Sequence, residues 1–131
     1  MKWLAKQISY DEMVFSQMAA RHNIDNTPRE EIKAHLARTA LALQTIRAYF
    51  RRPLIISSGY RCCDLNRLVG GASESHHTLG FAADFVVKDV PIERVIEVIP
   101  QLIEFDQLIN EYGRWIHLSI YPTLRRQIIK V

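Results

Sequence analysis

The feature that most constrains this fold is a long apolar stripe at helical spacing in the first half of the chain. Apolar side chains recur every three or four residues at Ile32, Leu36, Ala40, Leu43, Ile46 and Phe50. This spacing predicts an amphipathic helix that ends near Arg51-Arg52, before Pro53. Thr27-Pro28-Arg29-Glu30 is expected to open it as a capping box, with Pro28 at the first helical position. Such a helix has to bury its apolar face against another layer.

The remaining segments alternate between helical and strand-like patterns. Ser9 and Glu12 form a second capping box, which predicts a helix over residues 10–21. The later elements are expected in this order: a buried strand at 54–57, a short helix at 62–69, a strand at 81–87, a helix opened by Asp89 and Pro91, and a β-hairpin of strands 105–111 and 115–120. Residues 124–131 show no assignable pattern. The order predicts an α+β fold, with helices packed on one side of a mainly antiparallel sheet.

Composition indicates one ordinary globular domain. The chain has 131 residues, of which 48% are hydrophobic and 24% charged, and this suits a single domain over residues 1–131. The net charge of +3 is too weak to indicate nucleic acid as a partner, and an anionic polymer such as a cell wall would suit it equally well. No stretch has the length of a membrane span, so no membrane partner is expected. A monomer is the default expectation.

The cysteines and the N-terminus indicate the compartment of synthesis. Cys62 and Cys63 are adjacent and rarely pair in that arrangement, so no disulfide framework is implied and a reducing compartment is expected. Residues 1–6 lack the apolar run of a signal peptide. We therefore expect synthesis in the cytoplasm. Action outside the cell would require another means of release.

Three potential metal ligands project away from the expected core. In strand 81–87, Phe81, Ala83, Phe85 and Val87 share the core face, so Asp84 lies on the opposite face. His117 likewise alternates with the core residues of strand 115–120, and His77 lies in the loop before the first of these strands. Nitrogen, oxygen and nitrogen donors on one face can form a zinc site with the fourth position left for water. Magnesium and calcium prefer oxygen ligands.

Each of these residues also has an ordinary structural explanation. A histidine in a strand is usually a partly exposed or hydrogen-bonded side chain, and Asp84 alone could be a turn or ion-pair residue. His76 and His77 are adjacent, so only one of them is expected to be a ligand, and the other is expected to face solvent. The spacing of a histidine and an aspartate seven residues apart is by itself a weak signal.

The motifs as a set resemble a known family. Ser75-x-His77-x-x-Gly80-x-Ala82-x-Asp84 resembles the S-x-H-x-x-G-x-A-x-D signature of peptidase family M15, the zinc D-Ala-D-Ala carboxypeptidases and related peptidoglycan endopeptidases. The segment 57–61 with Asn66 is similar to the S-G-Y-R…N segment of that family, and residues 115–117 are similar to its W-x-H segment. Residues 23–28 resemble its compact phage and prophage branch. The resemblance implies a hedgehog/DD-peptidase-like fold and one zinc ion held by His77, Asp84 and His117.

The same resemblance implies a reaction. The family hydrolyses peptide bonds in peptidoglycan stem peptides, so either a carboxypeptidase or a phage endolysin-type endopeptidase that acts on the cell wall is expected. Arg61 matches the family arginine, which binds substrate or stabilises the oxyanion. Ser75 is expected to contact substrate or to orient a ligand.

The catalytic carboxylate departs from a common family pattern. Several members carry an acid three residues before the last histidine, where this chain has Arg114. Glu111, six residues before His117 and across the expected hairpin, is predicted to take this role, with Asp106 and Glu104 as weaker candidates. The departure leaves an alternative open, namely a non-catalytic, zinc-containing cell-wall-binding or phage structural module of the same fold.

Overall fold

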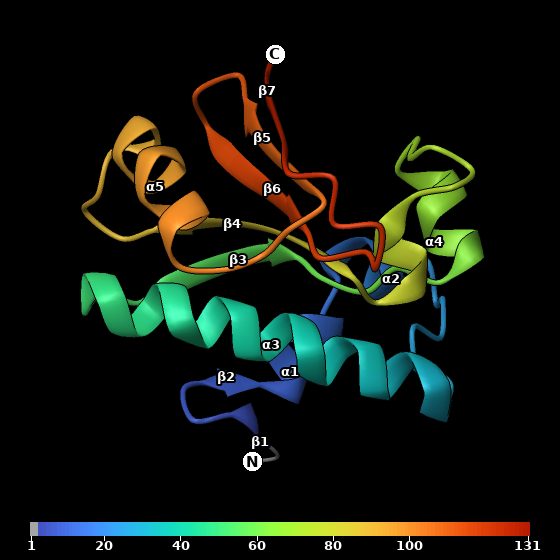
Figure 1. Cartoon of the computed structure of the whole chain (residues 1–131). Helices are drawn as coiled ribbons and strands as arrows, with labels where there is room; N and C mark the ends of the chain where they lie inside the picture. The colour runs from blue at the N-terminus through green and yellow to red at the C-terminus, as the bar shows by residue number, and fades with distance from the viewer. Residues whose placement is uncertain (1–2) are drawn as a thin grey trace.

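A computed structural model describes residues 3–131 (Figure 1). Its elements, in chain order, are β1 (Trp3–Ala5), β2 (Ile8–Ser9), α1 (Tyr10–Val14), α2 (Gln17–Arg21), α3 (Glu30–Phe50), β3 (Leu54–Ser58), α4 (Cys63–Leu68), the 3-10 helix η1 (His76–Leu79), β4 (Ala82–Val87), α5 (Ile92–Val98), the 3-10 helix η2 (Ile99–Gln101), β5 (Gln107–Glu111), β6 (Trp115–Ser119) and β7 (Gln127–Lys130).

The main sheet has five strands in the order β3-β4-β6-β5-β7. Its neighbouring strands are antiparallel, except for the parallel pair β5–β7. β1 and β2 form a separate two-stranded sheet, which the sequence did not predict. The expected α+β fold with a mainly antiparallel sheet is confirmed.

One face of the sheet carries the core. Leu36, Leu43 and Ile46 of α3 are fully buried, as are Phe85 of β4 and Val95 of α5. All of them belong to one continuous apolar cluster, in which α3 lies along the sheet as Figure 1 shows. Because α3 and α5 bury their apolar faces against the same face of the sheet, the opposite face is available for a site.

The first predicted helix is interrupted. The Ser9–Glu12 capping box is present, but α1 ends at Val14 because Phe15 has extended backbone angles. Ser16 then caps α2 by accepting a hydrogen bond from the Ala19 amide. Two short helices therefore replace the single helix expected over residues 10–21.

The start of the long helix is also later than expected. α3 begins at Glu30, with Arg29 as its N-cap and no capping side chain. The Thr27 amide donates instead to Asp25 Oδ1, at 2.9 Å. This local turn competes with the predicted capping box and places Pro28 before the helix.

Two further strands differ from expectation. β3, predicted to be buried, is an edge strand, and Ile55 on it is 54% exposed. The unassigned tail contains β7, which pairs with β5 and is largely exposed. A short strand at the rim of a sheet buries too little to show an alternating pattern, which explains why the sequence did not reveal it.

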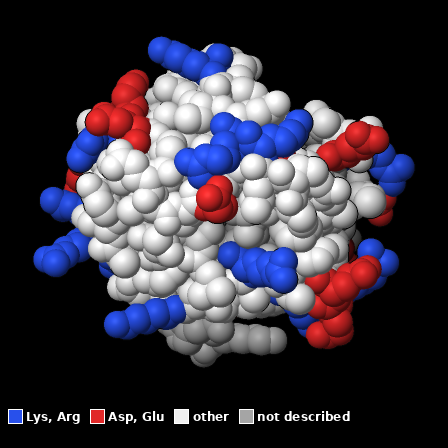
Figure 2. All heavy atoms as spheres, viewed as in Figure 1, with Lys and Arg blue, Asp and Glu red and all other residues white. Residues whose placement is uncertain are grey.

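Within residues 3–131, no helix combines the length and apolar character needed to cross a bilayer. Both cysteines are free thiols. On the face seen in Figure 2, the Lys and Arg side chains of the described residues lie in small groups, separated by uncharged surface and by acidic side chains.

Candidate metal centre and cleft

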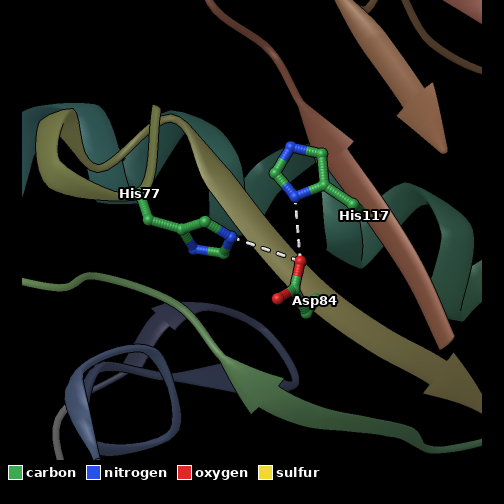
Figure 3. A group of neighbouring side chains, drawn as sticks. All are labelled: His77, Asp84 and His117. Carbon is green, nitrogen blue, oxygen red and sulfur yellow. Dashed lines mark hydrogen bonds and ion pairs between the residues drawn. The ribbon is translucent and has the colours of Figure 1, made fainter. Parts of the chain in front are cut away.

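His77, Asp84 and His117 converge on the open face of the sheet (Figure 3). Asp84 in β4 lies directly opposite His117 in β6 in the antiparallel register. His77 approaches from η1, just before β4. One donor atom from each residue lies within 4.8 Å of the others. Among the described residues, this is the one group of His, Cys, Asp and Glu side chains with such spacing.

The loop before β4 holds His77 in place. Ser75 caps η1 by accepting a hydrogen bond from the His77 amide, at 3.2 Å. Gly80 follows η1 with a φ of 81°, a conformation that favours glycine. A Cβ at Gly80 would also lie only 3.0 Å from the Ile32 carbonyl oxygen. The turn therefore packs tightly on α3, and the His77 side chain is almost completely buried.

The hydrogen bonds of His77 fix its tautomer. Its Nδ1 lies 2.7 Å from the Gly59 carbonyl oxygen, which can only accept, so Nδ1 carries a proton. In the neutral ring, Nε2 therefore directs a lone pair at Asp84 Oδ1, 3.2 Å away. Two acceptors at this distance repel each other unless a proton or a metal ion lies between them. This arrangement is typical of a histidine ligand oriented by a backbone carbonyl.

The donor set fits zinc. Ligand atoms around a tetrahedral zinc lie roughly 3.4 Å apart, given bonds of about 2.0–2.1 Å. Asp84 Oδ1 is 3.2 Å from His77 Nε2 and 2.9 Å from His117 Nδ1. Burial raises the pKa of the Asp84 carboxyl, but the contacts with His117 and His77, when a proton lies between each ring nitrogen and the carboxylate, outweigh it and hold this pKa well below its ordinary value. Asp84 is therefore a carboxylate at neutral pH, as a ligand must be.

Arg61 lies beside this group, where its amide donates to the His77 carbonyl at 3.1 Å, and it lines a cleft of about 400 Å³. The cleft is also lined by Ser57 and Ser58 and by apolar side chains such as Phe15 and Ile56. The Arg61 Nη2 donates to Ser75 Oγ at 3.3 Å, whereas its Nε is buried with no partner among the described residues. Burial lowers the pKa of the Arg61 guanidinium, and the Asp84 charge opposes this shift.

Ser75 links the two sides of the site. Besides capping η1 and contacting Arg61, it lines a smaller cleft of about 200 Å³ together with Glu74, Gln107 and His117. Its position suits the predicted contact with substrate, and that role stays a prediction.

The hairpin of β5 and β6 places Glu111 on the same side of the sheet as His117. Three residues form the loop, Glu111 pairs with Trp115, and Ile109 pairs with His117. Glu111 and His117 are thus diagonal neighbours on one face, roughly 7–8 Å apart. The Glu111 carboxylate forms no hydrogen bond or ion pair within residues 3–131 and is not part of the three-donor group.

The weaker acid candidates are engaged elsewhere. Asp106 is completely buried, and its carboxylate accepts hydrogen bonds from Arg125 and Thr123. Glu104 is exposed and pairs with Arg126 at 2.8 Å. Neither carboxylate is available to a substrate at the three-donor group.

The expectation that His76 faces solvent is wrong. Its ring stacks on Tyr121, with centroids 4.5 Å apart, and its Nδ1 lies 2.6 Å from Ser119 Oγ. Ser119 is fully buried and also accepts a hydrogen bond from the Tyr121 amide. His76 therefore forms part of the wall of the smaller cleft. The spacing of adjacent histidines gave no signal for this contact, because its partners lie more than forty residues away.

Taken together, an antiparallel sheet with two histidines and an aspartate on its open face has the features of a metallopeptidase scaffold. A family model described as Peptidase M15 matches residues 6–119. The chain belongs to peptidase family M15 and is thereby a hydrolase of the peptidase class, which confirms the resemblance seen in the motifs. The match includes all the site residues above and ends before β7. A search of curated proteins found no match.

Proposed function

We propose that this protein is a zinc-dependent metallopeptidase that hydrolyses peptide bonds in peptidoglycan stem peptides, as a D-Ala-D-Ala carboxypeptidase or an endolysin-type endopeptidase. The observation that carries the proposal is the convergence of His77 Nε2, His117 Nδ1 and Asp84 Oδ1 next to an arginine whose buried Nε has no partner within residues 3–131. Family membership supports the peptidase class.

The three converging side chains would hold one zinc ion. When bound, zinc supplies an acidified water molecule and polarises the carbonyl of the substrate. The Gly59 carbonyl keeps His77 in the tautomer that presents Nε2 to the metal.

Arg61 would bind the substrate. A buried donor without a partner costs free energy, and an incoming oxygen removes that cost. The Arg61 Nε therefore suits a carbonyl that gains negative charge during the reaction, or a substrate carboxylate.

Glu111 would move protons. Its carboxylate, which has no hydrogen bond or ion pair among the described residues, lies one diagonal step from His117 and would reach a water molecule at the three-donor group. It would accept a proton from that water and deliver it to the leaving amine.

The substrate and location extend the family assignment. Stem peptides carry carboxylates, which suit Arg61 and the mildly basic chain. On the face seen in Figure 2, the basic side chains of the described residues lie in separate small groups. We propose action on the cell wall, in a phage or prophage context, by a protein made in the cytoplasm that works as a monomer.

The first experiment measures metal and activity together. Purified protein is expected to hold about one zinc per chain and to release stem-peptide fragments from cell walls. His77→Ala is expected to lose both the metal and the hydrolysis. Full hydrolysis by a protein stripped of zinc would overturn the proposal.

The second experiment separates an enzyme from a binding module. Glu111→Gln is expected to retain zinc but lose at least about a hundredfold in kcat. Glu104→Gln, which alters an exposed acid paired with Arg126, serves as the matched control and is expected to keep wild-type activity. If the wild-type protein retains wall fragments but cleaves none of a panel of stem peptides, the binding-module alternative is correct.

A further inference from the structure

The segment between α2 and α3 contains an asparagine that the proposed reaction leaves unexplained. Asn26 is half-buried, and its side chain forms three hydrogen bonds to backbone atoms. Its Nδ2 donates to the carbonyl oxygens of Val14, at 2.9 Å, and Tyr60, at 3.0 Å. Its Oδ1 accepts from the Cys62 amide at 2.8 Å. The side chain thus joins three segments that are distant in sequence.

Two of these bonds lie on either side of Arg61. The carbonyl of Tyr60 belongs to the peptide before Arg61, and the amide of Cys62 belongs to the peptide after it. A single rigid amide group therefore fixes both peptide planes that flank Arg61. The backbone conformation at Arg61, and with it the direction of its side chain, depends on this contact.

The side chain of Arg61 has few other restraints. Its one hydrogen bond, to Ser75 Oγ, is long at 3.3 Å, and its Nε has no partner among the described residues. Its backbone amide donates to the His77 carbonyl at 3.1 Å. Since the guanidinium is so weakly held, the backbone has to set its direction before substrate arrives.

The Asn26 carboxamide also joins the Arg61 loop to the end of α1. Val14 is the last residue of α1, and Asn26 supplies a donor to its carbonyl, which lies beyond the helical pairing. The Tyr60 amide donates to the neighbouring Met13 carbonyl at 2.7 Å. Any Cβ at Gly59 would lie 2.2 Å from that same Met13 oxygen. The loop is therefore pressed against α1, and Asn26 closes the contact from the other side.

We propose that Asn26 is the positioning residue for Arg61: its carboxamide holds the peptides on both sides of the arginine, so that the guanidinium points at the substrate beside the His77–Asp84–His117 group. This inference rests on the proposed peptidase function. It predicts that loss of Asn26 acts on substrate turnover through Arg61, and not through the metal.

Two variants at Asn26 and one control test this. Asn26→Ala removes all three hydrogen bonds. Asn26→Asp keeps the shape of the side chain and the oxygen that accepts from the Cys62 amide. It replaces Nδ2 with a second oxygen, which cannot donate to the carbonyls of Val14 and Tyr60. Both are expected to lower kcat/KM on stem peptides by about 10- to 100-fold, as expected for a misplacement of up to about 1 Å. Their zinc content is expected to equal that of the wild type.

The control is an amide that bridges distant segments far from the site. Gln44 accepts a hydrogen bond from the Gln7 amide at 2.6 Å, and its Nε2 donates to Gln7 Oε1 at 2.9 Å. Gln44→Ala removes a comparable side-chain bridge and is expected to keep wild-type kcat/KM and zinc content.

A double-mutant cycle distinguishes positioning from general destabilisation. With Arg61→Ala as the background, adding Asn26→Ala is expected to cause no further loss of kcat/KM, because the group that Asn26 positions is already gone. Additive losses, wild-type activity of both Asn26 variants, or loss of zinc in step with activity would each overturn the proposal.

A readout without turnover keeps the inference separate from the proposed function. The Arg61 Nε–H group gives its own heteronuclear NMR signal. This signal is expected to shift and broaden in Asn26→Ala and to stay unchanged in Gln44→Ala. An unchanged signal in Asn26→Ala would contradict the positioning role. A wild-type protein that cleaves no stem peptide would instead refute the proposed function, and the NMR result would still decide the role of Asn26.

Discussion

Two aspartates, Asp84 and Asp106, are held as carboxylates inside this small protein, and they differ in what surrounds them. The pKa of Asp106 is held well below its usual value mainly by the hydrogen bond from Arg125, which outweighs the effect of burial, and Thr123 adds to it. For Asp84, burial raises the pKa, and the contacts with His117 and His77 more than reverse this when a proton lies between each ring nitrogen and the carboxylate.

The surroundings of Asp106 are complete. Arg125 donates through its backbone amide, Nε and Nη2, and Thr123 donates through its hydroxyl group. A permanent cation compensates the buried charge. These hydrogen bonds fix the segment that follows β6, and β7 then pairs with β5.

The surroundings of Asp84 are incomplete. Its partners are imidazole nitrogens, and the Gly59 carbonyl keeps the lone pair of His77 directed at the carboxylate. A carboxylate that faces ring nitrogens needs a proton or a metal ion in each contact, whereas one that faces a guanidinium does not. This difference separates the candidate metal centre from the structural contacts of Asp106 beside the same sheet.

The largest expected effect is on metal binding at Asp84. Asp84→Asn replaces a charged ligand with a neutral amide, and zinc affinity is expected to fall by more than about 100-fold, beyond the effect of altering an outer-shell partner. Chelator competition measures the affinity, and circular dichroism checks that the fold remains. Retention of wild-type affinity would show that the two aspartates do not differ in this respect.

The matching substitution at Asp106 is expected to act on stability alone. Asp106→Asn weakens the charged hydrogen bonds to Arg125, so the free energy of unfolding is expected to fall by about 2–3 kcal/mol. Urea unfolding measures this change, and zinc affinity is expected to stay at the wild-type value. A large loss of zinc affinity in Asp106→Asn would show that the contacts of Asp106 support the metal centre, and the comparison would fail.

The sequence predicted these two sites unequally. Asp84 and His117 could be assigned to the open face because they alternate with apolar residues in strands, and the motifs then joined them to His77. Asp106 gave no such signal. Its partner Arg125 lies in an irregular segment after β6, where neither periodicity nor spacing indicates a contact. Asn26 was part of a recognised segment, but its contacts with residues 60 and 62 exist only in the folded chain.

Helix ends show the same limit of sequence reasoning. The long helix was correctly predicted from its apolar spacing, since five of the six apolar positions are buried along one face. Its start was wrong because Asp25 competes for the Thr27 amide. The break at Phe15 was missed because the residues on both sides favour a helix, and the Arg61 loop packs against that break through Met13.

An intermediate effect is expected on the pH dependence of stability. The folded-state pKa of Asp106 is depressed. Its carboxylate therefore contributes to the free energy of unfolding at pH values above the unfolded-state pKa of about 3.9, and this contribution is lost progressively as the pH falls below that value. Metal-free wild-type protein is expected to have a larger free energy of unfolding than Asp106→Asn at pH near 6. This difference is expected to become smaller towards pH near 3. Asp84 is common to both proteins, so its titration cancels in this difference. A difference that stays constant between these two pH values would show that the charge of Asp106 is not what its contacts stabilise.

The smallest expected effect comes from Thr123, the neutral partner of Asp106. Its hydroxyl donates to Asp106 Oδ1 at 2.6 Å, and Thr123 is exposed. Thr123→Val keeps the shape of the side chain but removes this donor, while Arg125 still donates to both carboxylate oxygens. The free energy of unfolding is therefore expected to fall by about 1 kcal/mol or less. Urea unfolding of Thr123→Val and Asp106→Asn under the same conditions measures how much unfolding free energy each variant loses. An equal loss of unfolding free energy in the two variants would mean that the neutral hydroxyl, and not the arginine, stabilises the buried charge. The proposed difference between Asp106, compensated by a cation, and Asp84, a candidate metal ligand, would then need another basis.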